Sequence, residues 1–156
     1  MKINPLKLVV LALTVMVGTA PYVSNARNYK SPPKHKSSGM KPPAIAAMKF
    51  KNIEFGVNKA AVPAEAHASL DKVAKLMNEN KASLKLGGYA DKTGGYVYNW
   101  KLSKKRADAV KAYLVSKGSD STHIASVEYG YTHPIASNSS ANGRKKNRRV
   151  EIHFTE

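Results

Sequence analysis

The sequence predicts a two-layer α/β (α+β) sandwich, in which a mixed four-stranded sheet carries its helices on one face. Two observations predict this fold. Four segments alternate apolar and polar residues, as half-buried strands do, and two longer segments have apolar residues spaced along one face of a helix. Along the chain these segments follow the order strand, helix, strand, helix, strand, strand.

The first strand and the first helix are expected between residues 49 and 80. Residues 49–55 alternate as a strand does. Pro63 suits the first turn of the helix that follows, and Glu65 lies near the positive end of that helix. The helix is expected to end near Asn80. The residues that define the apolar sides of both elements are Ile53, Phe55, Leu70, Val73, Ala74 and Met77.

A second strand and a second helix are expected between residues 84 and 118. Residues 84–88 alternate and end in glycine, and residues 98–116 have helical spacing. Gly118 is suited to ending that helix, because glycine readily adopts the left-handed conformation found after helix ends. The residues expected on the buried side of this helix are Leu102, Val110, Tyr113 and Leu114.

The last two strands are expected over residues 127–131 and 150–154. Val127, Tyr129 and Tyr131 alternate in the first, and Val150, Ile152 and Phe154 in the second. Residues 137–146, which are rich in Ser, Asn and Gly, are expected to form a polar loop between them. In the last strand, Arg149, Glu151 and His153 fall on the side opposite the apolar residues. There, Arg149 and Glu151 are expected to form a solvated face, unless Arg149 supplies a cation to a site.

The N-terminus has the pattern of a secretory signal peptide over residues 1–26. Lys2 and Lys7 precede an apolar run of about 13 residues, and small residues at Ser24 and Ala26 suit cleavage after Ala26. The alternative is an uncleaved anchor, but the run is shorter than the ~20 residues that span a bilayer. The chain contains no cysteine, which excludes disulfides, thiolate metal sites and a lipid-bearing cysteine.

Residues 27–45 are expected to form a linker, because prolines, serines and lysines dominate this segment. The formal net charge of the whole chain is +16, and all of its acids lie after residue 45. The linker is either a spacer or a basic tether that reaches an anionic surface or an outer-membrane or envelope protein partner. Charge alone also allows nucleic acid, which the secretory signal argues against. The folded domain is expected over residues 46–156.

The loop after the second strand is the best candidate for a site. Asp91 ends the strand pattern, Gly94 and Gly95 make a turn, and the following helix carries Arg106. A carboxylate and a guanidinium beside one loop suit a small zwitterion, since the first takes an ammonium and the second a carboxylate. The alternative is that Asp91 and Arg106 form an ion pair with each other.

The same segment carries a family resemblance. Its ordered motifs, Asp91-Lys-Thr-Gly94, Tyr98-Asn99, Leu102-Ser103 and Arg106-Ala107, are followed by Gly130 with Pro134 and by Asn147-Arg-Arg-Val-Glu151. Over residues 48–155 this pattern resembles the peptidoglycan-binding domain shared by OmpA, the peptidoglycan-associated lipoprotein and MotB. The resemblance implies the fold described above, and non-covalent binding of the diaminopimelate residue in the peptidoglycan stem peptide.

The resemblance also implies roles for individual residues. Asp91 is expected to hold the ligand ammonium and Arg106 the carboxylate. Backbone N–H groups of the turn that contains Thr93 and Gly94 favour the same carboxylate. Asn99 and Leu102 are expected to shape the pocket, and Arg148 to face inward as a second cation. The implied protein is a periplasmic binding protein associated with the outer membrane, without a cofactor or an enzymatic activity.

Other interpretations of the sequence remain. The family pattern Gly-His-Thr-Asp is Gly88-Tyr-Ala-Asp91 here, which puts the affinity in doubt. The alternative function is a cationic envelope adaptor that binds lipopolysaccharide, another anionic polymer or a protein. The basic run 144–149 is expected to be a solvated loop. Ser69 with Lys72, and Lys92-Thr-Gly94, match penicillin-binding motifs without the necessary context. The histidines lack metal-ligand spacing.

Overall fold

The computed structural model describes residues 45–155. The signal peptide expected over residues 1–26 and the linker expected over residues 27–45 lie outside the described residues, except for Ile45. Ile45 is buried in the hydrophobic core, so the folded region includes this last residue of the expected linker. The strands and long helices follow the predicted order.

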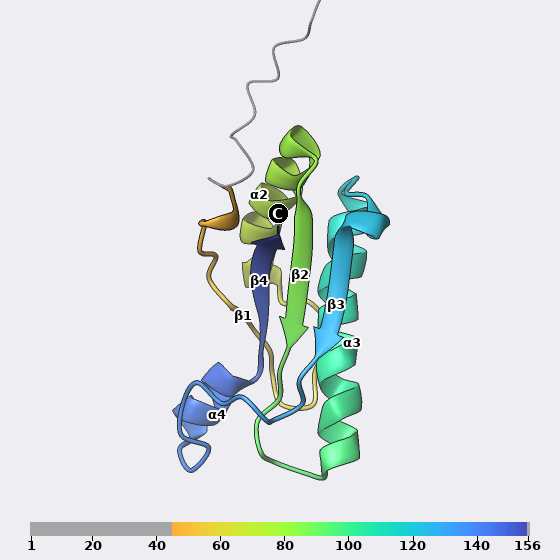
Figure 1. Ribbon diagram of the computed structural model, residues 1–156. Coiled ribbons are helices and arrows are strands. Elements are labelled where there is room, and N and C mark those ends of the chain that lie inside the picture. Colours follow the sequence, from red (N-terminus) through yellow and green to blue (C-terminus); the bar gives the residue numbers. More distant parts are fainter. Residues whose placement is uncertain (1–44, 156) are drawn as a thin grey trace, which may run out of the picture. The chain divides into compact units, whose positions relative to one another are not determined.

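The four strands form one mixed sheet (Figure 1). Its strand order is β1 (Ile53–Glu54), β4 (Arg149–Thr155), β2 (Ser83–Gly88) and β3 (Ile124–Glu128). β2 and β3 are parallel, whereas β4 is antiparallel to both β1 and β2. The prediction of a mixed four-stranded sheet is therefore confirmed, with the C-terminal strand in an interior position between β1 and β2.

Two helices, α2 (Ala64–Asn80) and α3 (Tyr96–Ser116), cover one face of this sheet (Figure 1). Strand register explains which residues form the core. Leu84 lies between Ile124 and Phe154 on the neighbouring strands, and Leu86 lies beside Ile152. All five side chains are buried against the apolar sides of the helices, as the alternation in β2 and β4 predicts. The helices begin at Ala64 and Tyr96, close to the predicted positions.

Three predicted elements differ in the structure. The first strand is confined to Ile53–Glu54, because only these residues pair with β4. The strand expected over residues 127–131 lies earlier, at Ile124–Glu128, after a short helical turn η1 (Ser121–His123). The expected polar loop contains a helix, α4 (Ala141–Asn147), whose start is capped by the Ser140 side chain. α4 buries only Gly143 and Asn147, so it carries no apolar periodicity.

Gly88 allows β2 and α3 to approach each other closely. A Cβ atom at this position would overlap the backbone carbonyl of Ser103. Because the backbone fixes the position of a Cβ atom and the carbonyl belongs to the backbone, neither group could rotate away. The glycine thereby fixes the distance between the end of β2 and the first turns of α3, the two elements that flank the loop containing Asp91.

The loops that follow β2 and β3 lie at the same end of the domain (Figure 1). The carboxyl ends of β2 and β3, the first turn of α3 and the whole of α4 lie there, whereas β4 finishes at the opposite end. The predicted site residues belong to this first end. The fold thus brings together segments that are separated in the sequence by 57 positions.

Candidate functional site

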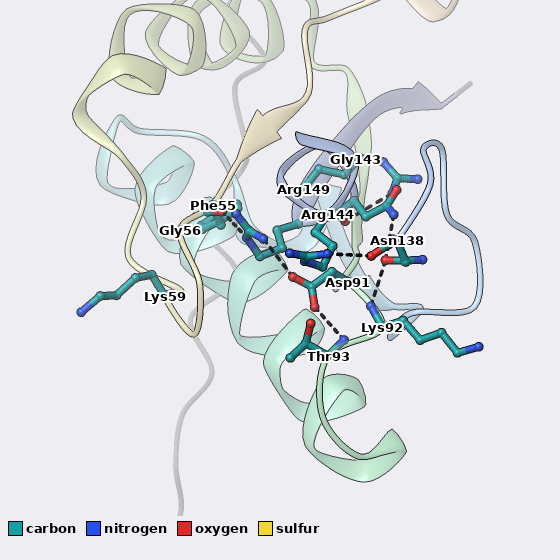
Figure 2. Close-up of polar contacts among 12 residues, drawn as sticks. Phe55, Gly56, Lys59, Asp91, Lys92, Thr93, Asn138, Gly143, Arg144 and Arg149 are labelled. Atoms are coloured by element: carbon teal, nitrogen blue, oxygen red, sulfur yellow. Dashed lines mark hydrogen bonds and ion pairs between the residues drawn. The ribbon is translucent and has the colours of Figure 1, made fainter. Parts of the chain in front are cut away.

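Asp91, labelled in Figure 2, lies in the loop after β2, three residues beyond Gly88, and is almost completely buried. Its Oδ2 accepts a hydrogen bond from Arg148 Nη1 at 2.9 Å, and its Oδ1 accepts one from the backbone N–H of Thr93 at 2.8 Å. Burial by itself would raise the pKa of Asp91, but the bonds from Arg148 and Thr93 lower that pKa below its ordinary value. Asp91 is therefore a buried carboxylate that stays ionised at neutral pH.

Arg148 lies between α4 and β4, and its side chain is only 11% exposed. Besides its ion pair with Asp91, its Nε donates to the carbonyl of Phe55 at 3.0 Å. The residue therefore connects the chain just after β1 with the loop after β2. It faces inward beside Asp91, as expected from its place next to the apolar side of β4.

Arg106 projects from α3 and is fully buried. Its guanidinium donates to three backbone carbonyls, those of Lys59 at 2.9 Å, Tyr89 at 2.9 Å and Gly56 at 3.1 Å. Burial, reinforced by the nearby charge of Arg148, lowers the pKa of Arg106 to about 10, so the side chain remains charged at neutral pH. The alternative ion pair between Asp91 and Arg106 is not formed, because Asp91 pairs with Arg148.

Six of the seven predicted site residues line one narrow hollow, called here the Asp91 hollow. They are Asp91, Thr93, Asn99, Leu102, Arg106 and Arg148, joined by Val57, Asn58 and Ala90. The seventh, Gly94, lies in the adjoining turn with a φ of +92°, a conformation that suits glycine. The structure therefore brings together an acid and two arginines from three separate parts of the chain.

The turn before α3 is held by side chains from two directions. Asn99 Nδ2 donates to the carbonyls of Thr93 at 2.9 Å and Gly94 at 3.3 Å. The backbone N–H of Lys92 donates to Asn138 Oδ1 at 3.0 Å (Figure 2). Two N–H groups of this turn, those of Lys92 and Thr93, thus already have acceptors within the protein. A ligand that used them would have to replace these bonds.

Asn138 and Asn147 support the site, and neither was among the predicted site residues. Asn147 is fully buried, and its Oδ1 accepts from the N–H groups of Ile135 and Ala136. Its Nδ2 donates to Asn138 Oδ1 at 3.0 Å, the oxygen that also receives the Lys92 N–H. The position of Asn147 within the last family motif was the only sequence signal for this role.

A wider groove opens beside the Asp91 hollow and shares Val57, Asp91, Thr93 and Arg148 with it. Its other lining residues are Lys92, Asn138, Ser139 and Arg144. Arg144 is fixed at the edge of the groove, since its Nη1 donates to the carbonyl of Asn138 and to that of Ser139. Figure 2 shows Arg144 and Asn138 together at this edge. The only acid among the groove's lining residues is Asp91, so the groove favours an anionic or zwitterionic ligand.

Tyr89 and Arg149 lie on the opposite face of the sheet from the helices. The Arg149 guanidinium lies 3.8 Å from the centre of the Tyr89 ring and pairs with Glu151 at 2.6 Å. Arg149 is only 2% exposed, so it does not belong to a solvated face. Tyr89 does not line the Asp91 hollow, whereas Ala90 does. Of the two departures from the family pattern, only the one at residue 90 reaches the hollow.

The two motifs that match penicillin-binding enzymes have no catalytic surroundings in the structure. The Ser69 hydroxyl donates to the Ala66 carbonyl within α2 at 2.8 Å, and Lys92-Thr-Gly94 forms a turn instead of a strand. Within residues 45–155, no group of three His, Cys, Asp or Glu side chains is arranged to hold a metal ion. None of the helices described in this range combines the length and apolarity needed to cross a membrane.

The described chain is thus a small α+β domain in which an acid and two arginines converge on one hollow. The chain belongs to the OmpA family, whose sequence profile matches residues 54–148. It is 42% identical over 115 residues to outer membrane protein A of Bordetella avium, a match that covers 72% of this chain and 59% of that protein.

Two further comparisons agree with this assignment. The chain is 43% identical over 110 residues to the peptidoglycan-binding protein ArfA of Mycobacterium tuberculosis, covering 70% of this chain and 34% of that protein. The crystal structure of the peptidoglycan-associated lipoprotein from Burkholderia pseudomallei superposes with a TM-score of 0.66 at 23% identity, over 73% of this chain and 93% of that one. The last match shows the same fold, as predicted. The chain spans less than two thirds of the length of these curated relatives, between 34% and 59%.

Proposed function

We propose that this protein binds peptidoglycan non-covalently, through the diaminopimelate residue of the stem peptide, and so holds its envelope partners to the cell wall. The observation that carries the proposal is the buried ionised Asp91, which shares one hollow with Arg106 and Arg148. The side chain of diaminopimelate ends in an ammonium and a carboxylate on a single carbon. A carboxylate beside guanidinium groups complements both charges over the same short distance.

Binding would proceed by an exchange of ion pairs. In the free protein, Asp91 and Arg148 satisfy each other at 2.9 Å. A zwitterion that enters between them gives its ammonium to Asp91 and its carboxylate to Arg148, so that one ion pair becomes two. Neither buried charge is left without a partner in the bound state, which avoids the large cost of an uncompensated charge.

Arg106 would supply further donors to the ligand carboxylate, beside the Asp91–Arg148 pair. Three of its five N–H groups are held by carbonyls of the described chain, which fixes the guanidinium and leaves two donors for the ligand carboxylate. Its position is therefore set before the ligand arrives, and little side-chain freedom is lost on binding. The backbone of the Lys92–Gly95 turn, held by Asn99, closes the other side of the hollow.

The proposed location is the periplasm, in association with the outer membrane. The relatives named above as outer-membrane and peptidoglycan-binding proteins support an envelope protein. The signal pattern over residues 1–26 and the basic segment over residues 27–45 support export and a tether to an envelope partner. The family assignment, with relatives named as outer-membrane and peptidoglycan-binding proteins, supports a binding protein without enzymatic activity.

Co-sedimentation of the purified protein with insoluble peptidoglycan sacculi tests the proposal. Two kinds of sacculi are compared at ~0.15 M salt, one with diaminopimelate in the stem and one with lysine. Lysine has the same ammonium but no carboxylate on that carbon. We expect strong binding to the diaminopimelate form, weak binding to the lysine form, and loss of binding in Asp91→Asn and Arg148→Gln.

Lys146→Ala is the matched control for charge, because this exposed lysine of α4 lines neither the hollow nor the groove. It should bind as the unmodified protein does. Equal binding to both kinds of sacculi, with loss in Lys146→Ala and at high salt, would instead show that the cationic surface holds the polymer. Circular dichroism of each variant confirms that the fold is retained.

A further inference from the structure

Large apolar side chains are exposed mainly at the end of the domain that contains the Asp91 hollow. Within residues 45–155, the exposed large hydrophobic residues are Val57, Tyr96, Val97, Tyr98, Trp100, Val115 and Ile135. Four of them lie in the first turns of α3, directly after the loop that carries Asp91. Tyr98 and Trp100 would ordinarily be packing residues at a helix start, but here half of the Tyr98 surface and 36% of Trp100 remain exposed.

Tyr96, Trp100 and Tyr131 form an ordered aromatic cluster, called here the aromatic platform. The rings of Tyr96 and Trp100 stack with centres 5.7 Å apart, and Tyr131 meets Tyr96 edge to face at 5.9 Å. Tyr96 is 51% exposed, so the stack presents much of its surface to solvent. Contiguous exposed apolar patches that are rimmed by polar residues mark interaction surfaces.

The aromatic platform is connected to the Asp91 hollow by direct contacts. Trp100 packs on the turn at Gly130, where a Cβ atom would lie 3.5 Å from the Trp100 ring. The carbonyl of Gly130 accepts a hydrogen bond at 2.7 Å from the N–H of Ala90, the residue before Asp91. The platform and the hollow therefore form neighbouring parts of one end of the domain.

We infer that the aromatic platform binds a pyranose ring of the peptidoglycan glycan strand while the Asp91 hollow holds the stem peptide. This inference rests on the proposed function. One face of a β-linked N-acetylated pyranose presents C–H bonds, which pack on the electron-rich face of an aromatic ring. Its rim carries hydroxyl and amide groups, which suit the tyrosine hydroxyls and the solvated surroundings of the platform.

Continuity with the hollow favours a sugar over other occupants. In peptidoglycan each stem peptide is attached to a sugar. A protein that binds the peptide therefore has a pyranose ring close to its surface. Two linked contacts on one polymer strengthen binding, because the second contact forms at a high effective concentration. The rings are rigid and already stacked, so little conformational freedom is lost when a sugar settles on them.

Trp100 is the only tryptophan of the chain, so its fluorescence reports directly on the platform. The first experiment titrates the protein with a tetramer of β-1,4-linked N-acetylglucosamine, which has no peptide. We expect a saturable change in Trp100 fluorescence. Tyr96→Phe keeps the ring and should keep the response, whereas Tyr96→Leu keeps apolar bulk without the ring and should weaken binding roughly three- to tenfold.

A second experiment compares a free diaminopimelate-containing tripeptide with the same tripeptide attached to its disaccharide. The disaccharide form should bind the unmodified protein roughly three- to tenfold more tightly. This advantage should disappear in Tyr96→Leu, while the affinity for the free tripeptide stays the same. Asp91→Asn should lose the tripeptide but keep the response to the sugar tetramer, so failure of the hollow and failure of the platform are distinguishable.

Equal affinities for the two tripeptide forms, or a tetramer response unchanged in Tyr96→Leu, would overturn the inference. The same holds if the tetramer produces no change in Trp100 fluorescence. Analytical ultracentrifugation tests the main rival occupant, a second copy of this chain. Self-association that Tyr96→Leu abolishes would assign the platform to a protein interface and would also overturn the inference.

Discussion

Asp91 and Arg148 are 57 positions apart in the sequence and form an ion pair with an N–O distance of 2.9 Å. Their side chains are 7% and 11% exposed, so water screens this pair weakly. The pair joins the loop after β2 to the junction of α4 and β4. The same two groups would separate when a zwitterion binds, which links the stability of this end of the domain to the proposed function.

The Asp91→Asn variant should lose stability in a pH-dependent way. The pKa of Asp91 is lowered in the folded protein, against about 3.9 in an unfolded chain. The ionised carboxylate therefore stabilises the fold at pH values above about 4, and this contribution is lost as the pH falls through the lower folded pKa. At pH 7 the variant should be less stable by about 1–3 kcal/mol, because a charge-assisted bond is weakened.

Urea unfolding of both proteins at pH 7 and pH 3 measures this effect. The difference in free energy of unfolding should shrink at pH 3. The pKa values of Asp108 and Glu151 are also lowered, but both proteins share these groups, so the comparison isolates Asp91. A difference of the same size at both pH values would contradict the assignment of an ionised Asp91.

The Gly88→Ala variant should be destabilised by at least about 2 kcal/mol, because the new Cβ atom would overlap the Ser103 carbonyl. Gly95→Ala is the matched control, since no atom lies within 4 Å of a Cβ built there. The control should change the free energy of unfolding by less than about 1 kcal/mol. Thermal or urea unfolding compares the two, and equal losses would mean that the β2–α3 approach is not constrained by Gly88.

Local sequence patterns predicted the strands and helices in which buried residues recur at regular spacing. Leu84, Leu86 and the apolar residues of β4 alternate, and their alternation identified both strands and the buried side. β3 was misplaced because Tyr129 extends the alternation that begins at Val127. Register shows that Val127 and Tyr129 belong to the side away from the helices, with Tyr129 stacked on Tyr89 at 4.9 Å. α4 was missed because its buried residues are a glycine and an asparagine.

The sequence predicted which residues line the site better than it predicted which of them bond to each other. Motif positions identified Asp91, Arg106 and Arg148, and all three line the hollow. Spacing along the chain could not show that Asp91 forms its ion pair with Arg148, or that Arg106 donates hydrogen bonds to three backbone carbonyls. Those choices depend on how β1, β4 and the loop after β2 meet in space. The supporting role of Asn147 likewise depends on a loop conformation that no local pattern encodes.

The Asn147→Ala variant should loosen the loop around residues 135–138 and, through it, the turn at Lys92. The variant leaves the N–H groups of Ile135 and Ala136 without their acceptor, and removes the donor to Asn138. We expect the Lys92 amide proton to exchange roughly tenfold faster or more. The free energy of unfolding should fall by about 1–3 kcal/mol.

Amide hydrogen exchange followed by NMR measures this coupling. Asn142→Ala is the matched control, because it makes the same chemical change at an exposed position of the same short helix. Its Lys92 amide should exchange at the unmodified rate. If both variants protect the Lys92 amide equally, the bridge from Asn147 through Asn138 does not hold the turn.

The Tyr89→His variant should separate stability from binding. Tyr89 covers the Arg149 guanidinium at 3.8 Å and stacks on Tyr129, but it does not line the Asp91 hollow. Histidine restores the family pattern at this position with a smaller ring, which covers less of Arg149. We expect the free energy of unfolding to fall by about 1–2 kcal/mol. The affinity for a diaminopimelate-containing tripeptide should change by less than about twofold, since a two-fold change corresponds to only a few tenths of a kcal/mol.

Ala90→Ser is the variant to compare with Tyr89→His, because Ala90 lines the hollow and serine restores a hydroxyl there. Calorimetric titration of both variants with the tripeptide compares the two positions. A changed affinity in Ala90→Ser together with an unchanged one in Tyr89→His would place the functional departure from the family at residue 90 alone. A large change in Tyr89→His would mean that the face of Tyr89 and Arg149 communicates with the ligand through the end of β2.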